Sequence, residues 1–275
     1  MRKYGLAILV GLAMSATATA QGPAWRFRWQ VGQTLQYRVD HVTTVTEVVG
    51  SNKTETTAKL ALVKRWQVQA VDGQGVATLQ LSLAAMRNEQ TRPDGSVLLF
   101  DSANPEKSTP ELREQLAKYV GATLAILRVD GYGRVVGVPQ GDAKRYESEL
   151  PLVVVLPEAA PAAGQAWERS YKITLDPPQG TGEEYETVQK YVCEKVEGSA
   201  GHIRLATQLK NTPASLRDQI PLLQKQTAGE IVFDIGSGRL HSARLLVDKV
   251  LEGHQGPGSS YRFQSTYTEQ YVPNN

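Results

Sequence analysis

The feature that most constrains the fold is an alternation of apolar and polar residues with a period of two. Residues 35–39 (LQYRV), 66–71 (WQVQAV) and 76–83 (VATLQLSL) each alternate in this way. Such a segment places its apolar side chains on one face of a strand, as in antiparallel sheets that cover a core on one side. Residues 72–75 (DGQG) separate two of these segments, and an acidic residue followed by glycine predicts a hairpin there. The chain is therefore predicted to be mainly β, built from antiparallel meanders that form curved sheets or half-barrels.

Helix signals are few. Residues 108–111 (STPE) combine hydroxyl caps, a first-turn proline and an early glutamate, which predicts a helix start. Apolar residues at roughly helical spacing continue from Leu112 to Ile126. Residues 215–218 (SLRD) predict a second start, and Pro221 keeps that helix short or bent. We expect one or two short helices, and we expect them to plug or flank the sheet.

Aromatic residues are concentrated in two alternating segments. In the last predicted strand one face carries Tyr261, Phe263, Ser265, Tyr267, Glu269 and Tyr271. This face is expected to pack on the core or to line a groove. Near the N-terminus Trp25, Phe27 and Trp29 also alternate, either as an exposed binding platform or, as we prefer, as a first strand that closes the core. The candidate ligand-binding residues from both segments are Trp25, Trp29, Tyr261, Phe263 and Tyr267.

Three short patterns recur in the same order in the two halves of the chain, which predicts an internal duplication. The pairs are residues 31–35 with 163–167, 71–73 with 196–198, and 129–135 with 233–240. Between the halves, residues 157–164 (PEAAPAAG) have no periodicity and read as a linker or a tight crossover. The predicted organisation is a signal peptide over 1–20, a first β-rich repeat over 21–156, a linker over 157–164 and a second β-rich repeat over 165–275.

Taken together, these patterns resemble a family of uncharacterised exported bacterial proteins with duplicated β-meander halves. The matching residues are Gly32, Gln33, Leu35 and Tyr37; Trp66, Val68, Val71, Asp72 and Gly75; Gly164, Gln165 and Trp167; and Phe233, Asp234, Gly238 and Arg239. The resemblance implies a location and a shape, because its motifs are turns and strands, and it carries no activity. More distantly, the pattern is similar to the half-barrels of periplasmic lipoprotein carriers.

The N-terminus has the three parts of a secretory signal peptide. Arg2 and Lys3 are followed by a mostly apolar stretch over residues 5–14 and by small residues that end in Ala-Thr-Ala at 18–20. This order predicts cleavage after Ala20. The apolar stretch is far shorter than the roughly 20 residues that a membrane-spanning helix needs. We expect export through the secretory pathway to the periplasm or the outside, and no transmembrane segment in the mature chain.

The net charge excludes some classes of binding partner, and the single cysteine excludes an intramolecular disulfide. Removing Arg2 and Lys3 from the 30 basic residues leaves 28, which equals the 28 acidic residues, so the mature chain is formally neutral. Nucleic acids and anionic membranes bind concentrated positive charge, so neither is expected as the main partner. The single cysteine, Cys193, cannot form an intramolecular disulfide and is expected to be a buried apolar residue.

No constellation of catalytic or metal-ligating residues stands out. The four histidines, His41, His202, His241 and His254, lack metal-ligand spacing, and no G-x-S-x-G motif occurs. We therefore predict no cofactor, no metal and no catalytic residues. The preferred function is a binding module for a hydrophobic or lipid-like ligand. The alternatives are a structural or protein-interaction module of the cell envelope, or an enzyme with a pocket near His202 or His241.

Overall fold

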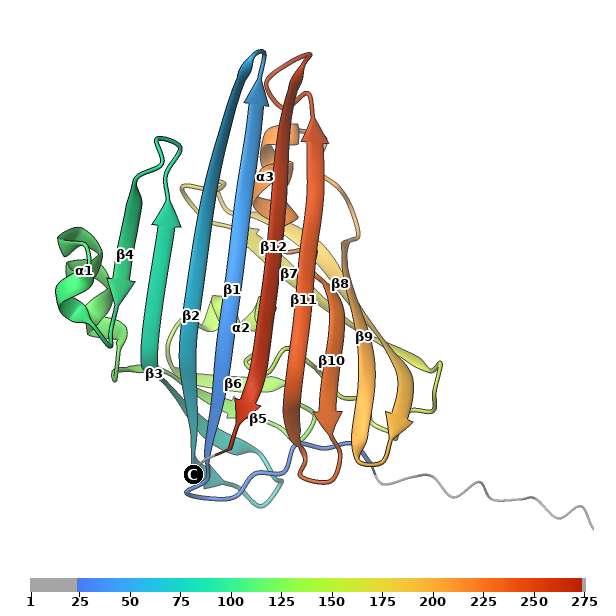
Figure 1. Ribbon diagram of the computed structural model, residues 1–275. Coiled ribbons are helices and arrows are strands. Elements are labelled where there is room, and N and C mark those ends of the chain that lie inside the picture. The colour runs from blue at the N-terminus through green and yellow to red at the C-terminus, as the bar shows by residue number, and fades with distance from the viewer. Residues whose placement is uncertain (1–23, 274–275) are drawn as a thin grey trace, which may run out of the picture.

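The computed structural model describes residues 24–273, and its main feature is one antiparallel sheet of twelve strands (Figure 1). The predicted signal peptide lies outside the described residues. The strand order is β6-β5-β3-β2-β1-β12-β11-β10-β9-β8-β7. The twelfth strand, β4, pairs with β3 and lies outside this order. The strands are β1 (Thr34–Val49), β2 (Asn52–Val71), β3 (Ala77–Thr91), β4 (Val97–Asp101), β5 (Thr123–Val129), β6 (Val135–Gln140), β7 (Ala166–Leu175), β8 (Glu183–Glu197), β9 (Ala200–Leu209), β10 (Ala228–Asp234), β11 (Arg239–Glu252) and β12 (Ser259–Val272).

The two halves of the chain share this sheet because the last strand returns to the first. β12 pairs with β11 on one side and with β1 on the other, so Tyr271 lies opposite Tyr37. The central strands β2, β1, β12 and β11 are long and rise above the rest of the sheet (Figure 1). The mainly β class and the antiparallel meanders predicted from the sequence are confirmed.

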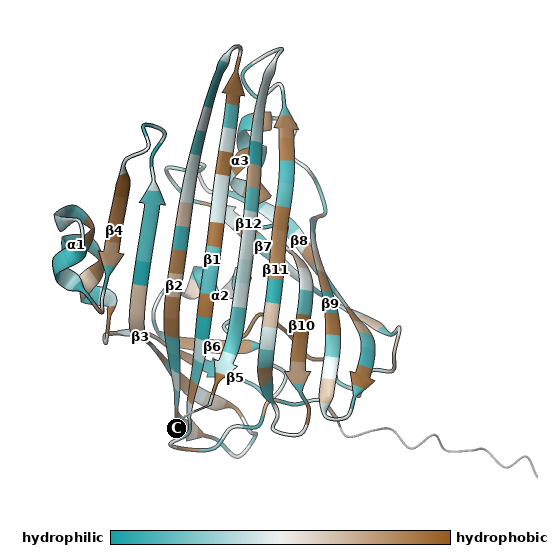
Figure 2. Ribbon diagram, viewed as in Figure 1, coloured by the Kyte–Doolittle hydropathy of each residue, from teal (hydrophilic) through white to brown (hydrophobic). Residues whose placement is uncertain are grey.

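Alternation along the strands decides which side of the sheet is buried. On β1, Leu35, Tyr37 and Val39 are buried, whereas Arg38 between them is exposed. Figure 2 shows the same change between apolar and polar residues along β2 and β11. The apolar sides of the strands meet in one core at the base of the molecule, which includes Trp66 and Phe233. Cys193 belongs to this core, and burial raises the pKa of its thiol.

Within residues 24–273, three short helices accompany the sheet. α1 (Pro110–Leu116) starts where the sequence predicted and is flanked by the 3-10 turns η1 (Pro105–Lys107) and η2 (Ala117–Tyr119). The helical spacing beyond Leu116 was misleading, because β5 begins at Thr123. α3 (Leu216–Leu223) is capped by Ser215, whose side chain accepts a hydrogen bond from the Asp218 backbone N–H. α2 (Ala143–Ser148) was not predicted, since it is short and its residues are mostly polar.

The sheet is not closed, and α2 lies between its edge strands. α2 contacts both β6 and β7, which stand at opposite ends of the strand order. The apolar segment 150–156 (LPLVVVL) that follows α2 is held nearby by hydrogen bonds. The Leu156 N–H donates to the Tyr132 carbonyl (2.8 Å), and the Trp167 indole N–H on β7 donates to the Val155 carbonyl (2.7 Å). This segment therefore joins the two edges through helix and loop rather than through a strand ladder.

Residues 24–30 form no strand, contrary to the expectation, but they do close the core. Trp25 and Phe27 are buried. The Phe27 N–H donates to the Gly131 carbonyl in the β5–β6 turn (2.8 Å), and the Arg28 N–H donates to the Gly238 carbonyl in the β10–β11 turn (2.9 Å). This segment connects hairpin turns that lie far apart in the sequence.

Two turns that the sequence matched are built alike. The N–H of Gly32 donates to the Val68 carbonyl (2.9 Å), and the N–H of Gly164 donates to the Cys193 carbonyl (2.7 Å). Both glycines have positive φ, 81° and 84°. Residues 157–164 contain neither helix nor strand. The duplication and its boundaries stay a prediction.

Candidate functional site

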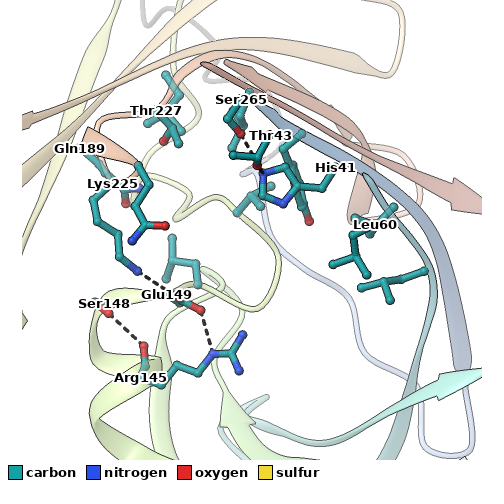
Figure 3. Close-up of a pocket in the computed structure, with 18 of the residues that line it drawn as sticks. His41, Thr43, Leu60, Arg145, Ser148, Glu149, Gln189, Lys225, Thr227 and Ser265 are labelled. Atoms are coloured by element: carbon teal, nitrogen blue, oxygen red, sulfur yellow. Dashed lines mark hydrogen bonds and ion pairs between the residues drawn. The ribbon is translucent and has the colours of Figure 1, made fainter. Parts of the chain in front are cut away.

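A cavity of about 480 Å³ lies on the inward face of the long central strands (Figure 3). Strands β1, β2, β11 and β12 form one wall, and α2 with the segment after it forms the opposite wall. Residues of β7, β8 and β9 and of the chain after α3 complete the lining. These residues are inward because they occupy alternate positions of each strand. The apolar residues that line the cavity are Val39, Leu60, Leu62, Leu150, Val153, Leu205, Leu245 and Phe263.

A second hollow of about 440 Å³ adjoins the cavity. The two spaces share Leu60, Leu62, Lys64 and Arg145 in their linings. The other residues of the second hollow are mostly apolar: Leu81, Leu83, Met86, Leu116, Tyr119, Leu124, Asp142 and Tyr146. The inward face thus carries an apolar surface that continues from β12 toward β3 and α1.

The sheet wall of the cavity has one neutral polar cluster. The His41 Nε2 lies 2.8 Å from the Ser265 hydroxyl and 3.3 Å from the Thr43 hydroxyl. The His41 ring also meets the Tyr267 ring edge-on, with 5.8 Å between centroids. Burial lowers the pKa of His41 below its ordinary value, because the imidazolium form loses its hydration. The cluster therefore presents hydroxyls and a neutral imidazole near pH 7.

Next to this cluster, a charged pair is embedded in the sheet. Lys64 Nζ on β2 lies 3.2 Å from Glu269 Oε1 on β12, and it lies 2.9 Å from the Tyr267 hydroxyl. The Tyr267 hydroxyl donates a 2.5 Å hydrogen bond to Glu269. Burial, and then the neighbouring carboxylate, raise the pKa of Tyr267 well above its ordinary value, so the phenol stays protonated. Lys64 reaches the cavity lining, whereas Glu269 is buried behind it.

The helical wall carries a second charged cluster, opposite the histidine (Figure 3). Glu149 just after α2 accepts a hydrogen bond from Arg145 Nε (2.8 Å) and another from Lys225 Nζ just after α3 (2.9 Å). Burial disfavours the Glu149 carboxylate, but the two cations outweigh burial and hold its pKa below the ordinary value. Glu149 therefore ties together two segments that are 76 residues apart.

The segment that crosses beneath the cavity is strained at one residue. Val153 lines the cavity and has φ of 53°, and it is the one non-glycine residue with positive φ between residues 24 and 273. The Val154 N–H donates to the Leu152 carbonyl (2.7 Å), which makes a γ-turn around Val153. A β-branched residue with positive φ is sterically costly, and such strain is commonly found at functional sites.

The structure separates the ligand-binding candidates into two groups. Phe263 and Tyr267 line the cavity, and Tyr261 lies further along β12, where its ring meets His254 edge-on at 5.9 Å. Trp25 and Trp29 lie at the base instead. Trp25 stacks on Phe233 (6.2 Å) and Trp29 stacks on Phe27 (5.2 Å), and neither lines the cavity.

Sequence reasoning missed most of the polar residues of the cavity. His41 shares the face of Leu35, Tyr37 and Val39, so an extension of the β1 alternation could have placed it inward. Arg145, Glu149 and Lys225 carried no comparable signal, because short polar segments meet there only through the tertiary fold. The histidines considered for an enzyme lie elsewhere: His202 Nε2 is 3.5 Å from the exposed Glu197, His241 is exposed, and neither lines the cavity.

Two features are absent from residues 24–273. Within this range, no group of three or more His, Cys, Asp or Glu side chains is placed to hold a metal ion. None of the helices in the described part of the chain has the length and apolar character needed to cross a membrane.

Comparisons with known proteins give distant likenesses. No protein-family model matches the chain, and no curated protein matches it. Among solved structures, the chain is similar to lipovitellin, whose structure concerns its lipid–protein interactions. The identity is 14% and the TM-score is 0.49, over 89% of this chain and 25% of that chain. It is also similar to DynF from the dynemicin biosynthesis pathway of Micromonospora chersina, with 7% identity and a TM-score of 0.24 over 96% and 94% of the two chains. A further match is the MucA/MucB complex of Pseudomonas aeruginosa, with 9% identity and a TM-score of 0.13 over 85% and 89%. The chain therefore spans a quarter of the lipovitellin chain that it matches, and the family named from the sequence stays a resemblance.

Proposed function

We propose that the protein binds a hydrophobic, lipid-like molecule in the cavity between the long strands and α2. The observation that carries this proposal is that the inward face of the sheet is filled at the base but hollow above it. At the base Tyr37, Trp66 and Phe233 have almost no exposed surface. Higher in the sheet, Leu60 and Leu62 on β2 and Phe263 on β12 line open space and stay partly exposed.

The form of the cavity supports this proposal. Its volume of about 480 Å³, like that of the adjoining hollow, falls in the range of roughly 300–1,000 Å³ that is common for small-molecule sites. Such sites combine a mainly apolar lining with a few convergent polar groups. His41, Ser265 and Lys64 on one wall and Glu149 with Lys225 on the other provide those groups.

Export belongs to the same proposal. The signal peptide predicted over residues 1–20 would release a mature chain outside the cytoplasm, in the periplasm or beyond it. An apolar molecule that travels through an aqueous compartment needs a protein that removes its surface from water. A binding protein with an open apolar cavity fits that need.

The alternative is a structural or protein-interaction module of the cell envelope. The observation in its favour is a pair of exposed apolar residues on the outer face, Val42 on β1 and Leu246 on β11, which both lie opposite Thr266 on β12. Small exposed apolar groups of this size are common on proteins that have no partner there. The cavity therefore carries the stronger proposal.

The test combines extraction and occlusion. The mature protein, purified after export without detergent, is extracted with organic solvent, and the extract is analysed by mass spectrometry. We expect an apolar molecule in stoichiometric amount. In parallel, the uncharged fluorophore N-phenyl-1-naphthylamine is titrated into the delipidated protein, and its fluorescence should rise as it enters the cavity.

Two neighbouring residues on β1 provide the matched variants. Thr43 lines the cavity, whereas Val42 points to the outer face. Thr43→Trp should fill the space and abolish the fluorophore signal, and Val42→Trp should leave it unchanged, with circular dichroism showing that both variants fold. An equal response of the two variants would reject the cavity as the binding site. An empty extract together with no fluorophore binding would reject ligand binding and favour the envelope-interaction alternative.

A further inference from the structure

The geometry points to the chemistry of the ligand: we infer that it is a single-chain amphiphile with a carboxylate headgroup, which Arg145 binds. This inference rests on the proposed function, because it assigns a ligand class to the same cavity. Its basis is the position, the free donors and the charge of Arg145.

Arg145 lies where the cavity and the adjoining hollow meet, since it lines both. Its Nε donates to Glu149 Oε2 at 2.8 Å. Among residues 24–273, no protein group accepts a hydrogen bond from its two terminal nitrogens, Nη1 and Nη2, and the side chain is 63% exposed. A guanidinium with free donors forms a rigid fork that matches the two oxygens of a carboxylate.

Among the described groups, those that line the cavity itself and their ion-pair partners sum to one positive charge, and Asp142, which lines only the adjoining hollow, also acts on Arg145. Lys64 is neutralised by Glu269. Arg145 and Lys225 share the single carboxylate of Glu149, so that cluster has a formal charge of +1. His41 adds no charge near pH 7, because burial disfavours its imidazolium form. A ligand with one negative charge would complete this balance, and a cationic headgroup would oppose it.

The surroundings of Arg145 also orient the ligand. Asp142, the N-cap of α2, is the acidic residue on the rim of the adjoining hollow, so a negative headgroup is repelled from that side. The rest of that hollow is rich in Leu and Tyr side chains, including Leu81, Leu83 and Tyr119. We therefore place the carboxylate beside Arg145 on the Lys225 side, with the alkyl chain running over Leu60 and Leu62 into the adjoining hollow.

The test compares headgroups on one chain length. Hexadecanoate, hexadecanol, hexadecyl phosphate and hexadecyltrimethylammonium each displace N-phenyl-1-naphthylamine from the delipidated mature protein. We expect hexadecanoate to bind at least about tenfold more tightly than hexadecanol, as one charge-assisted bidentate contact would provide. Hexadecyltrimethylammonium should bind more weakly than hexadecanol.

The variants isolate the contribution of Arg145. Arg145→Gln should remove the preference for hexadecanoate over hexadecanol, and Arg145→Lys should keep part of it, because an ammonium retains the charge but lacks the fork. Lys144→Gln is the matched control: it removes one charge from the same helix, but Lys144 lines neither space. This control should preserve the preference and bind hexadecanol as the unaltered protein does. Circular dichroism shows whether each of the three variants is folded.

The outcomes separate this inference from the proposed function. Equal binding of hexadecanoate and hexadecanol, or a preference that survives Arg145→Gln, overturns the headgroup assignment while apolar binding stands. Tighter binding of hexadecyl phosphate than of hexadecanoate also overturns it. If neither the fluorophore nor any of the four amphiphiles binds, both the ligand class and the proposed function are rejected.

Discussion

Lys64 Nζ lies 3.2 Å from Glu269 Oε1 across an intervening strand: Lys64 is on β2, Glu269 is on β12, and β1 runs between them. The Lys64 side chain is 20% exposed and the Glu269 side chain is fully buried. The pair therefore joins the N-terminal and C-terminal halves of the chain at the edge of the cavity, in surroundings where an unpaired charge is costly.

The first prediction concerns the removal of Lys64. Lys64→Met leaves the Glu269 carboxylate buried with the Tyr267 hydroxyl as its remaining partner, and it should lower the free energy of unfolding by about 3 to 5 kcal/mol. The double variant Lys64→Met/Glu269→Met removes both charges and should recover most of that loss. Urea unfolding of the unaltered protein, of Lys64→Met, of Glu269→Met and of the double variant gives the coupling energy.

The control for this prediction is an exposed pair. Lys195 and Glu197 are 2.7 Å apart, with side chains 54% and 59% exposed. Lys195→Met should cost far less than Lys64→Met, because water already solvates both charges. A Lys64→Met protein that is as stable as the Lys195→Met protein would contradict the assignment of a buried, coupled pair.

The second prediction concerns acid and Glu149. Lys225 and Arg145 hold the pKa of this carboxyl below its ordinary value of 4.5. A carboxyl whose pKa is lower in the folded state stabilises the protein above the unfolded pKa and loses that effect as the pH falls through the folded pKa. The Glu149 side chain is 42% exposed, so solvent screening limits the stabilisation to about 1 kcal/mol or less.

The measurement is a pH series of unfolding free energies for the native protein and for Glu149→Gln. The native protein should be the more stable one at pH values above 4.5, and the difference should vanish as the pH falls below the folded pKa of Glu149. About 1 M salt should shrink the difference at neutral pH. A difference that stays constant through the acid range would show that Glu149 acts through packing and not through charge.

The third prediction compares two glycines in turns of the same construction. Gly133 and Gly75 have φ of 86° and 79°, and each N–H donates to the carbonyl of the aspartate three residues earlier. A Cβ at Gly133 would lie 2.7 Å from both the Phe27 ring and the Val154 carbonyl oxygen, whereas a Cβ at Gly75 would meet nothing within 4 Å. The two glycines therefore differ in the space available to a Cβ and not in backbone conformation.

Gly75→Ala should cost about 1 to 2 kcal/mol, which is the price of a left-handed conformation for a residue with a Cβ. Gly133→Ala should cost at least about 2 kcal/mol more, because Phe27 must leave its place in the core. Thermal unfolding followed by circular dichroism measures both. Equal losses would show that residues 24–30 contribute little to closing the base.

The fourth prediction concerns the strain at Val153. Val153→Gly removes a β-branched side chain from a position with φ of 53°, so the relief of about 1 to 3 kcal/mol should offset the lost apolar contact. The neighbouring Val154 is fully buried and has no positive φ, so Val154→Gly should cost about 3 kcal/mol. Chemical unfolding of the two variants distinguishes them, and a similar loss for both would mean that Val153 is not strained.

The alternation of apolar and polar residues within single strands predicted part of the cavity lining. The pattern of β12 assigned Phe263, Ser265 and Tyr267 to one face, and all three line the cavity. On β1, Val39 and His41 are two residues apart and therefore lie on the same face of the strand. The opposite wall was not predictable in this way, because Arg145 and Glu149 belong to a short polar segment without periodicity. Lys225 is brought to Glu149 only by the return of the chain after α3.

The sequence by itself determined that the chain is mainly antiparallel strands, which face is apolar in the segments that alternate clearly, such as residues 35–39 and 66–71, and where several hairpins turn. These properties depend on covalent neighbours, because side chains alternate along an extended backbone and a turn is decided within four or five residues. Only the tertiary structure decided that β12 lies between β1 and β11, that α2 joins the edge strands β6 and β7, and that a cavity remains between them. Those outcomes depend on contacts between segments far apart in the chain, such as Tyr37 with Tyr271, and a local pattern of polarity cannot specify which distant strand becomes the neighbour.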